Sequence, residues 1–243
     1  MNKTSDYGFT IIVPVFNEVD NIQMLEETLS DFLPKSLLKS CVLFVDDGST
    51  DGSLDGIRRI CSRNDHFYYI SFSRNEGLSA ALKAGFDHAG SEYVGYIDAD
   101  LQTVPEDFNL LLKEIPYCSM AIGIRADRKD SFFKNLQSRV ANGFRRMMTQ
   151  DGALDTGCPL KVIRTDVARS FPMFKGMHRF LPALVLLEEG ASYRQVPVRH
   201  FPRKAGKSKF HLWNRLFGPL ADCLAYRWMK SRIIRPKVTD SNL

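Results

Sequence analysis

The stretch from Glu92 to Gln102 reads EYVGYIDADLQ, a short β-like run that ends in two carboxylates and an amide. Side chains at alternate positions of an extended segment share one face, so Asp98, Asp100 and Gln102 are predicted to converge. Oxygen ligands of this kind suit Mg²⁺ or Mn²⁺, which usually complete their shell with substrate phosphates. Because an Asp-x-Asp pair also occurs by chance in surface turns, the surrounding sequence decides its meaning.

Outward from this stretch, strands alternate with helical patterns. Strands are predicted over Phe9–Phe16, Cys41–Val45, Phe67–Phe72 and Glu92–Ile97, and amphipathic helices lie between them. This alternation predicts an α/β fold with a mostly parallel, Rossmann-like sheet flanked by helices. Polar loops follow three of the strands and are expected to share the edge of the sheet where ligands bind, namely Asn17-Glu18, Asp46-Asp47 and Asp98-Ala99-Asp100.

After Pro105 the pattern is less regular. Further helices are predicted over Glu106–Ile115, Phe132–Met148 and His178–Glu188, and further strands over Met120–Ile124, Cys158–Ile163 and Tyr193–Arg199. Between Leu212 and Ile234, Gly218-Pro219 is expected to separate two helices. Residues 1–210 are therefore predicted to form one domain, and residues 211–243 a basic, amphipathic helical tail.

The charge of the chain is unevenly distributed. Of the net charge of +5, residues 199–237 carry +10 and the remainder carries −5. A basic segment of this kind favours an anionic partner such as a phosphate, an acidic lipid or a nucleic acid. Apolar residues at helical spacing in the tail (Leu216, Leu220 and Leu224) leave two alternatives open. They either lie on an anionic membrane surface or pack on the domain.

Cysteine usage and hydropathy give expectations about location. The five cysteines are widely spaced and include no Cys-x-x-Cys pair, which favours reduced thiols in a cytosolic protein. The polar segment Met1–Tyr7 has no signal-peptide core. The apolar stretch Phe180–Leu187 is far shorter than the roughly 20 residues that a membrane-spanning helix needs. The chain is therefore expected not to span a membrane.

Four motifs carry a family resemblance, in the order PVFNE (14–18), VDDGS (45–49), RNEG (74–77) and DADLQ (98–102). Together they resemble family 2 glycosyltransferases of the GT-A fold. With Pro105-Glu106 following, the last motif is similar to the polyprenyl-phosphate glycosyltransferases. That group includes the dolichol-phosphate mannose synthases and the undecaprenyl-phosphate sugar transferases. The resemblance implies inverting transfer of a sugar from a UDP- or GDP-linked donor to a polyprenyl (undecaprenyl or dolichyl) phosphate, with Mg²⁺ or Mn²⁺ as cofactor.

The resemblance also assigns roles to individual residues. The positions that match the nucleotide-sugar site are Pro14, Phe16, Glu18, Val45, Asp47, Asp98 and Ala99. Those that match the metal ligands are Asp98, Asp100 and Gln102, and Asp100, Asp155 and Arg125 match catalytic positions. Two departures are Phe16, where tyrosine is common, and Pro159, where phenylalanine is usual.

The acceptor determines which side chains the reaction needs. A hydroxyl acceptor must lose its proton to a general base, whereas a phosphate monoester, with a second pKa of about 6, is already anionic. An enzyme acting on phosphate therefore mainly needs cations, and the positions that match the family's are Arg125, Arg139, Arg203 and Lys209. For Arg139 a solvated helix face is the alternative.

Other functions remain open at this point. The chain could use a hydroxyl acceptor in surface polysaccharide synthesis, or bind a nucleotide sugar without catalysis. Nucleic-acid binding is disfavoured because the basic tail has no recognition motif. The expected location is the cytoplasm, at the inner face of the cell membrane, reached through an anionic membrane surface or a separate membrane subunit.

Overall fold

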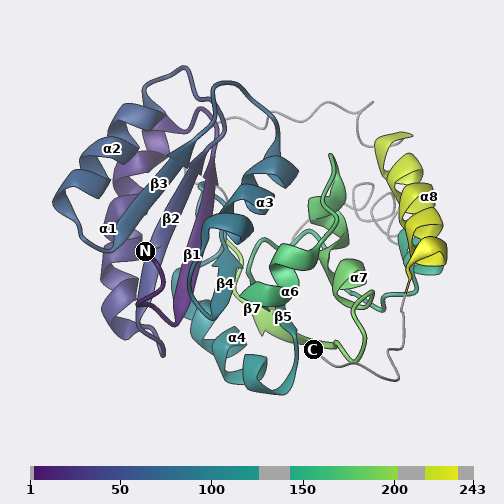
Figure 1. The fold of residues 1–243 in the computed structure, drawn as a ribbon. Helices are drawn as coiled ribbons and strands as arrows, with labels where there is room; N and C mark the ends of the chain where they lie inside the picture. Colours follow the sequence, from purple (N-terminus) through teal and green to yellow (C-terminus); the bar gives the residue numbers. More distant parts are fainter. Residues whose placement is uncertain (1–2, 126–142, 202–216, 235–243) are drawn as a thin grey trace, which may run out of the picture.

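The computed structural model describes residues 3–125, 143–201 and 217–234, which form one mixed sheet covered by helices on both faces (Figure 1). Among these residues the sheet has seven strands in the order β3-β2-β1-β4-β6-β5-β7. Their bounds are β1 Phe9–Val15, β2 Ser40–Asp46, β3 Phe67–Ser71, β4 Tyr93–Tyr96, β5 Met120–Arg125, β6 Lys161–Arg164 and β7 Tyr193–Val198.

The directions of the strands bring six carboxyl ends to one edge of the sheet. β1, β2, β3 and β4 are parallel, β6 is antiparallel to both β4 and β5, and β5 is parallel to β7. The carboxyl ends of all strands except β6 therefore lie at the same edge, together with the amino end of β6. The predicted mostly parallel sheet is confirmed, and β6 is the strand that runs the other way.

Helices cover both faces of the sheet and enclose two apolar cores. One core contains side chains of α1 (Ile22–Phe32), α2 (Ser53–Arg63) and α4 (Phe108–Glu114). The other contains side chains of α3 (Leu78–His88), α6 (Thr165–Ser170), α7 (Leu181–Val185) and α8 (Phe217–Arg232). Short 3₁₀ turns adjoin several helices, at η1 Val19–Asn21, η2 Leu33–Lys35, η3 Pro105–Asp107, η4 Ile115–Tyr117 and η5 Met177–Phe180.

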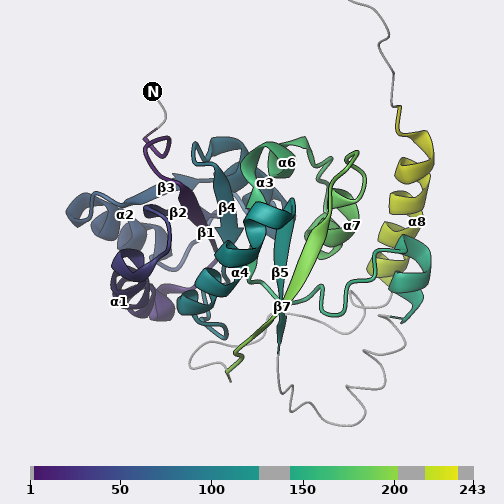
Figure 2. The ribbon, with the colours of Figure 1, turned by 90° about the horizontal axis from the view of Figure 1, so that it is seen from below.

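The central strands form because their sequences are apolar on both faces. β2 is buried along its whole length, and β1 is buried at all but one position. Such near-continuous apolar runs are typical of parallel strands that have helices on both sides. In both views α8 lies on the outer side of α7, away from α1 and α2 (Figures 1 and 2).

The second half of the chain differs from the prediction in several places. β6 begins at Lys161, after the loop residues of the predicted strand Cys158–Ile163. The predicted helix His178–Glu188 is a 3₁₀ turn followed by α7, which ends at Val185, and helix α6 was not predicted. Of the predicted helix Phe132–Met148, only 143–148 are described, and residues 143–149 are helical.

The structure bears on whether the leucines of the tail pack on the domain, which the sequence left open. Leu220 and Leu224 are exposed on α8, so the expectation that they pack on the domain is wrong, while Leu216 lies outside the described residues. Because α8 begins at Phe217, Pro219 falls in its first turn, where proline is tolerated. The proposed domain boundary at residue 210 lies outside the described residues. None of the described helices is both long and apolar enough to cross a bilayer.

Candidate functional site

The loops after β1 and β2 meet at the shared edge, as the sequence predicted. The backbone N–H of Asn17 donates to Ser49 Oγ at 2.9 Å, and the Thr50 N–H donates to Asn17 Oδ1 at 2.7 Å. The Glu18 N–H donates to Ser53 Oγ at 2.9 Å. These reciprocal bonds hold the first and second motifs together, and each N–H is satisfied locally.

Asp47 ties the second motif to the third. Its Oδ1 accepts the N–H of Glu76 at 2.7 Å and that of Gly77 at 3.2 Å, and its Oδ2 accepts Gly77 N–H at 2.9 Å and Asn75 Nδ2 at 2.8 Å. Burial raises the pKa of Asp47, and the two backbone donors partly offset this shift. Both oxygens thus orient the 74–77 loop at the start of α3. The predicted contact with a nucleotide base stays a prediction.

Gly48 explains why these two motifs can pack so closely. Its φ is +70°, and a Cβ at this position would lie 2.4 Å from the carbonyl carbon of Arg74. Only glycine has both the backbone freedom and the space for this approach. The sequence VDDGS therefore needs its glycine to bring the RNEG segment against Asp47.

The DADLQ segment is a turn, which corrects the extended geometry expected from the sequence. β4 ends at Tyr96, the Leu101 N–H donates to the Asp98 carbonyl at 3.2 Å, and Leu101 has a left-handed φ of +49°. The Gln102 N–H also donates to Asp100 Oδ1 at 3.2 Å. Asp98, Asp100 and Gln102 therefore lie in one short turn after β4, and their predicted convergence on a metal stays a prediction. The strand-like alternation that the prediction assumed does not extend beyond β4.

The donor set of this turn fits a hard divalent cation. Asp98 is half-buried and Asp100 is buried, so two carboxylates and one amide lie within a single turn at the carboxyl edge of the sheet. No group of three or more His, Cys, Asp and Glu residues among the described residues could hold a metal. Mg²⁺ and Mn²⁺ match such a sparse site, since they commonly use one or two carboxylates and take further ligands from bound phosphates.

Arg125 and Asp155 form a bidentate pair at the same edge. Arg125 Nε donates to Asp155 Oδ2 at 2.7 Å and Nη2 donates to Oδ1 at 2.8 Å, and the Arg125 backbone N–H adds a bond of 3.2 Å. The side chains are only 14% and 9% exposed. Burial disfavours the charged form, but the bonds and charge of Asp155 outweigh it and raise the pKa of Arg125, with Asp98 contributing. Arg125 and Asp155, both predicted site residues, therefore form one ion pair.

Lys161 is a buried cation next to the candidate site that was not predicted from the sequence. It is fully buried at the amino end of β6, where it pairs in register with Tyr96 of β4. Its ammonium donates to Tyr96 Oη at 3.2 Å, to the Thr156 carbonyl at 3.3 Å and to the Cys158 carbonyl. A lysine inside the apolar run Leu160–Ile163 was the available signal, because lysine is almost never fully buried.

The chain after β7 returns to the acidic turn. Arg199 pairs with Asp107 at 2.7 Å, and the Phe201 N–H donates to the Gln102 carbonyl at 2.8 Å. Of the predicted acceptor-binding cations, Arg125 is at this edge, whereas Arg139, Arg203 and Lys209 lie outside the described residues. Phe201, two residues before Arg203, is thus hydrogen-bonded to the DADLQ segment itself.

The remaining predicted nucleotide-site residues lie on β1, β2 and their loops, except Ala99, which belongs to the DADLQ turn after β4. Pro14 and Val45 are paired in register near the strand ends, and Phe16 is half-buried just after β1. The Val45 side chain belongs to the core shared with α3, and Ala99 belongs to the core on the opposite face. Pro14, Phe16 and Val45 therefore line the border between the sheet and its loops.

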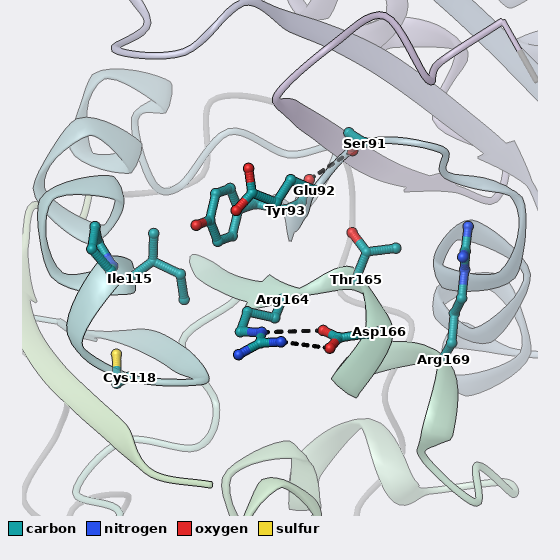
Figure 3. A pocket seen from close by; sticks show the side chains of 10 residues that line it. Ser91, Glu92, Tyr93, Ile115, Cys118, Arg164, Thr165, Asp166 and Arg169 are labelled. Carbon is teal, nitrogen blue, oxygen red and sulfur yellow. Dashed lines mark hydrogen bonds and ion pairs between the residues drawn. The ribbon is translucent and has the colours of Figure 1, made fainter.

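A cavity of about 490 Å³ lies at the other edge of the sheet, beside the amino end of β4 (Figure 3). Its lining includes Arg164 and Asp166, which point toward each other and pair at 2.6 Å. Arg169 also lines it and donates to the Phe86 carbonyl at 3.3 Å. Because none of its lining residues belongs to the four sequence motifs, we do not assign this cavity to the nucleotide sugar.

The comparison with protein families gives one match, and it covers most of the fold. The model of "Glycosyl transferase family 2" matches residues 10–171. The undecaprenyl-phosphate 4-deoxy-4-formamido-L-arabinose transferase of Edwardsiella ictaluri is 31% identical over 224 residues, 88% of this chain and 67% of that protein. The dodecaprenyl-phosphate galacturonate synthase of Rhizobium johnstonii is 29% identical over 93% of this chain and 68% of its own length.

Solved structures agree on the fold. The mannosyltransferase PcManGT of Pyrobaculum calidifontis, in complex with GDP-Man and Mn²⁺, has a TM-score of 0.62 at 21% identity, over 93% of this chain and 64% of that chain. Glucosyl-3-phosphoglycerate synthase of Mycobacterium tuberculosis, with Mn²⁺ and UDP, has a TM-score of 0.67 at 12% identity, over 96% and 83%. The sheet and its flanking helices are those of the GT-A fold, and the chain belongs to glycosyl transferase family 2.

Proposed function

We propose that this protein transfers a sugar from a nucleotide sugar to the phosphate of a polyprenyl phosphate. The observation that carries the proposal is the composition of one edge of the sheet. There the Asp98 carboxylate of the DADLQ turn lies within electrostatic range of a largely buried cationic group, Arg125, at the end of β5. Relatives that cover most of this chain are named for transfer to undecaprenyl and dodecaprenyl phosphate, which supports the same acceptor class.

For the donor, we infer a UDP- or GDP-linked sugar bound with a divalent cation. Asp98, Asp100 and Gln102 would hold the ion, which when bound neutralises charge on the nucleoside diphosphate that leaves. Neighbours of the same fold are crystallised with GDP-Man or UDP and Mn²⁺, which supports this choice. Pro14, Phe16, Glu18, Val45, Asp47 and Ala99 are the candidate contacts to the nucleotide.

For the acceptor, the state of Asp155 favours a phosphate over a hydroxyl. A hydroxyl acceptor needs a carboxylate that is available to take a proton. Asp155, the predicted catalytic carboxylate that is paired with Arg125, accepts three of its hydrogen bonds. It therefore suits the positioning of a guanidinium better than proton abstraction. Arg125 keeps N–H groups beyond those used by Asp155, because a guanidinium carries five.

α8 supports association with a membrane, where a polyprenyl chain resides. Cys223 and Tyr226 are buried, and the Tyr226 hydroxyl donates to the Ala183 carbonyl of α7 at 3.1 Å. On its other side Leu220, Leu224 and Trp228 are 41%, 62% and 66% exposed and recur every four residues. Helical periodicity places two exposed cations, Arg227 and Arg232, on either side of this stripe. An apolar stripe between cations is typical of helices on anionic bilayers.

A transfer assay tests the reaction. Labelled UDP- and GDP-sugars are incubated with a short polyprenyl phosphate and Mn²⁺, and label in the lipid is measured. Transfer from at least one donor to the lipid is expected, and label passing only to free sugar hydroxyls would favour the hydroxyl-acceptor alternative. Binding of a donor with no transfer to either acceptor would favour the non-catalytic alternative.

The same assay tests the acceptor cations. Arg203→Ala is expected to raise the KM for lipid phosphate roughly tenfold, as loss of a charge-assisted hydrogen bond does, and to leave nucleotide affinity nearly unchanged. Arg59→Ala, which removes the same charge from an exposed position of α2, is the control and should change neither. An unaltered KM in the Arg203 variant would count against this assignment.

Vesicle flotation tests the membrane surface. The wild-type chain is expected to float with vesicles that contain anionic lipid and much less with neutral vesicles. Leu224→Glu with Trp228→Glu should abolish flotation, whereas Leu37→Glu, at an apolar side chain that is 53% exposed outside α8, should not. Equal flotation of all variants would dispose of α8 as the docking face and favour a separate membrane subunit.

A further inference from the structure

Within the described part of the chain, the hydrogen-bond partners of the buried Lys161 ammonium are all uncharged. Its side chain has no exposed area, and its three acceptors are the Tyr96 hydroxyl and the carbonyls of Thr156 and Cys158. Its ammonium also lies 5.0 Å from the centre of the Tyr96 ring. A buried ammonium without a contacting carboxylate is unfavourable for folding, so the position of this charge calls for a reason outside local packing.

The charges around Lys161 belong to the candidate site. Burial lowers the pKa of Lys161, and the carboxylates of Asp155 and Asp98 are among the groups that oppose this shift. Asp155 is already paired with Arg125, so Lys161 adds a second positive charge behind the DADLQ turn. Strand pairing fixes its place, because Tyr96 and Lys161 are register partners and Asp98 is two residues beyond Tyr96.

A hydrogen-bonding role alone does not need a charge. By donating to all three acceptors, the Lys161 ammonium links the end of β4 to the 156–158 segment. A neutral amide donor could make some of the same hydrogen bonds. Attraction of an anion to the DADLQ turn, by contrast, requires a positive charge. In a medium of low dielectric constant such a charge acts over several ångströms without contact.

We propose that Lys161 is a positioning residue whose fixed positive charge, held through Tyr96 beneath the DADLQ turn, favours binding of the anionic diphosphate of the nucleotide sugar there. Lys161 does not touch the ligand in this arrangement. The inference rests on the proposed function, since it assumes that a nucleoside diphosphate occupies this edge of the sheet. It adds a residue that none of the four sequence motifs contains.

The charge has opposite effects on the two components of the site. It repels a divalent cation that binds alone to Asp98 and Asp100, and it attracts a nucleoside diphosphate, which stays anionic with one bound Mn²⁺. Removing the charge should therefore leave the affinity for Mn²⁺ alone unchanged or higher, and lower the affinity for UDP or GDP in the presence of Mn²⁺ roughly tenfold. If Lys161 were only a structural link, its removal would weaken the binding of Mn²⁺ alone and of the nucleotide alike.

The test is calorimetric titration of the full chain, first with Mn²⁺ alone and then with UDP and with GDP at saturating Mn²⁺. Lys161→Met removes charge and donors at nearly constant length, Lys161→Gln removes the charge but keeps amide donors, and Lys161→Arg keeps the charge. Lys39→Met, the same substitution at an exposed residue by the other edge of the sheet, is the control and should change neither affinity. Circular dichroism and thermal unfolding establish that each variant is folded.

The expected result is that both neutral variants lose nucleotide affinity without losing Mn²⁺ affinity, and that the Arg variant, where it folds, retains both. Three results would overturn the proposal: full nucleotide affinity in Lys161→Gln, parallel loss of both ligands in Lys161→Met, or failure of both neutral variants to fold. A wild-type chain that binds neither UDP nor GDP with Mn²⁺ would instead refute the proposed function, which separates the two failures.

Discussion

Replacement of Asp155 with asparagine should destabilise the protein mainly through its partner. Arg125 is 14% exposed and Asp155 is 9% exposed, and three donors of Arg125 converge on the two carboxylate oxygens. Removing one member of a buried ion pair costs about 3–5 kcal/mol, because the other charge stays buried without compensation. The residual exposure of Arg125 favours the lower end of that range. For a chain of this length, about 3 kcal/mol lowers Tm by roughly 6–12 °C.

A double-mutant cycle isolates the interaction. Arg125→Met should destabilise the protein by a similar amount, since it removes the guanidinium charge and its two side-chain hydrogen bonds from the buried Asp155 carboxylate. The double variant carries neither charge of the pair and should be less destabilised than the sum of the single variants by about 2 kcal/mol or more. The measurement is urea unfolding at pH 7. The pair Arg164–Asp166, whose side chains are 52% and 64% exposed, is the matched control and should show coupling below about 1 kcal/mol.

One result would refute this reasoning. Additive effects of Arg125→Met and Asp155→Asn, within about 0.5 kcal/mol, would mean that the two side chains do not stabilise each other. The role of Asp155 would then have to be sought with the ligands.

Three further predictions concern metal binding, pH and backbone strain. Asp100→Asn should abolish Mn²⁺-dependent transfer and weaken Mn²⁺ binding at unchanged Tm; full activity with Mn²⁺ supplied would rule the assignment out. Burial lowers the pKa of His178 from 6.5 to about 3. Ser79 Oγ already accepts two backbone N–H groups, so it must donate its own proton to His178 Nδ1, which lies 2.8 Å away. The neutral ring therefore contributes stability that is present above pH 6.5 and lost as the pH falls toward 3, by up to about 1.4 kcal/mol per pH unit. Thermal unfolding should show a shallower acid loss in His178→Gln, and an unchanged slope would contradict the prediction. Gly48→Ala should lower Tm by several degrees because the new methyl group meets the Arg74 backbone at a φ of +70°, whereas Gly190→Ala, at a φ of +72° with open space, should cost less.

The first half of the fold was predictable because its signals are local. β1 and β2 are near-continuous apolar runs, each followed by an amphipathic helix, and their observed ends differ from the predicted ones by at most one residue. That the loops after β1, β2 and β4 lie at one edge of the sheet followed from parallel connectivity alone. The family resemblance then added the expectation of what those loops bind.

The rest depends on tertiary structure. The direction of β6 is set by its neighbours β4 and β5, and no short-range pattern encodes it. Leu101 has a left-handed backbone conformation, which is uncommon for leucine and folds the DADLQ segment into a turn. An extended conformation was therefore the natural prediction for this segment. Lys161 was missed for a similar reason, because its contact with Tyr96 depends on the pairing of β4 with β6, which lie far apart in the sequence.

The reversed strand β6 has a consequence for hydrogen exchange. It sits between β4 and β5 and is paired on both sides, so its amides can exchange only when the middle of the sheet separates. The loops that surround the DADLQ turn have no such constraint. Slow exchange at Val162 and Ile163 beside fast exchange at the rim would describe a protein that admits its ligands through loop openings while the floor of the site stays closed until global unfolding.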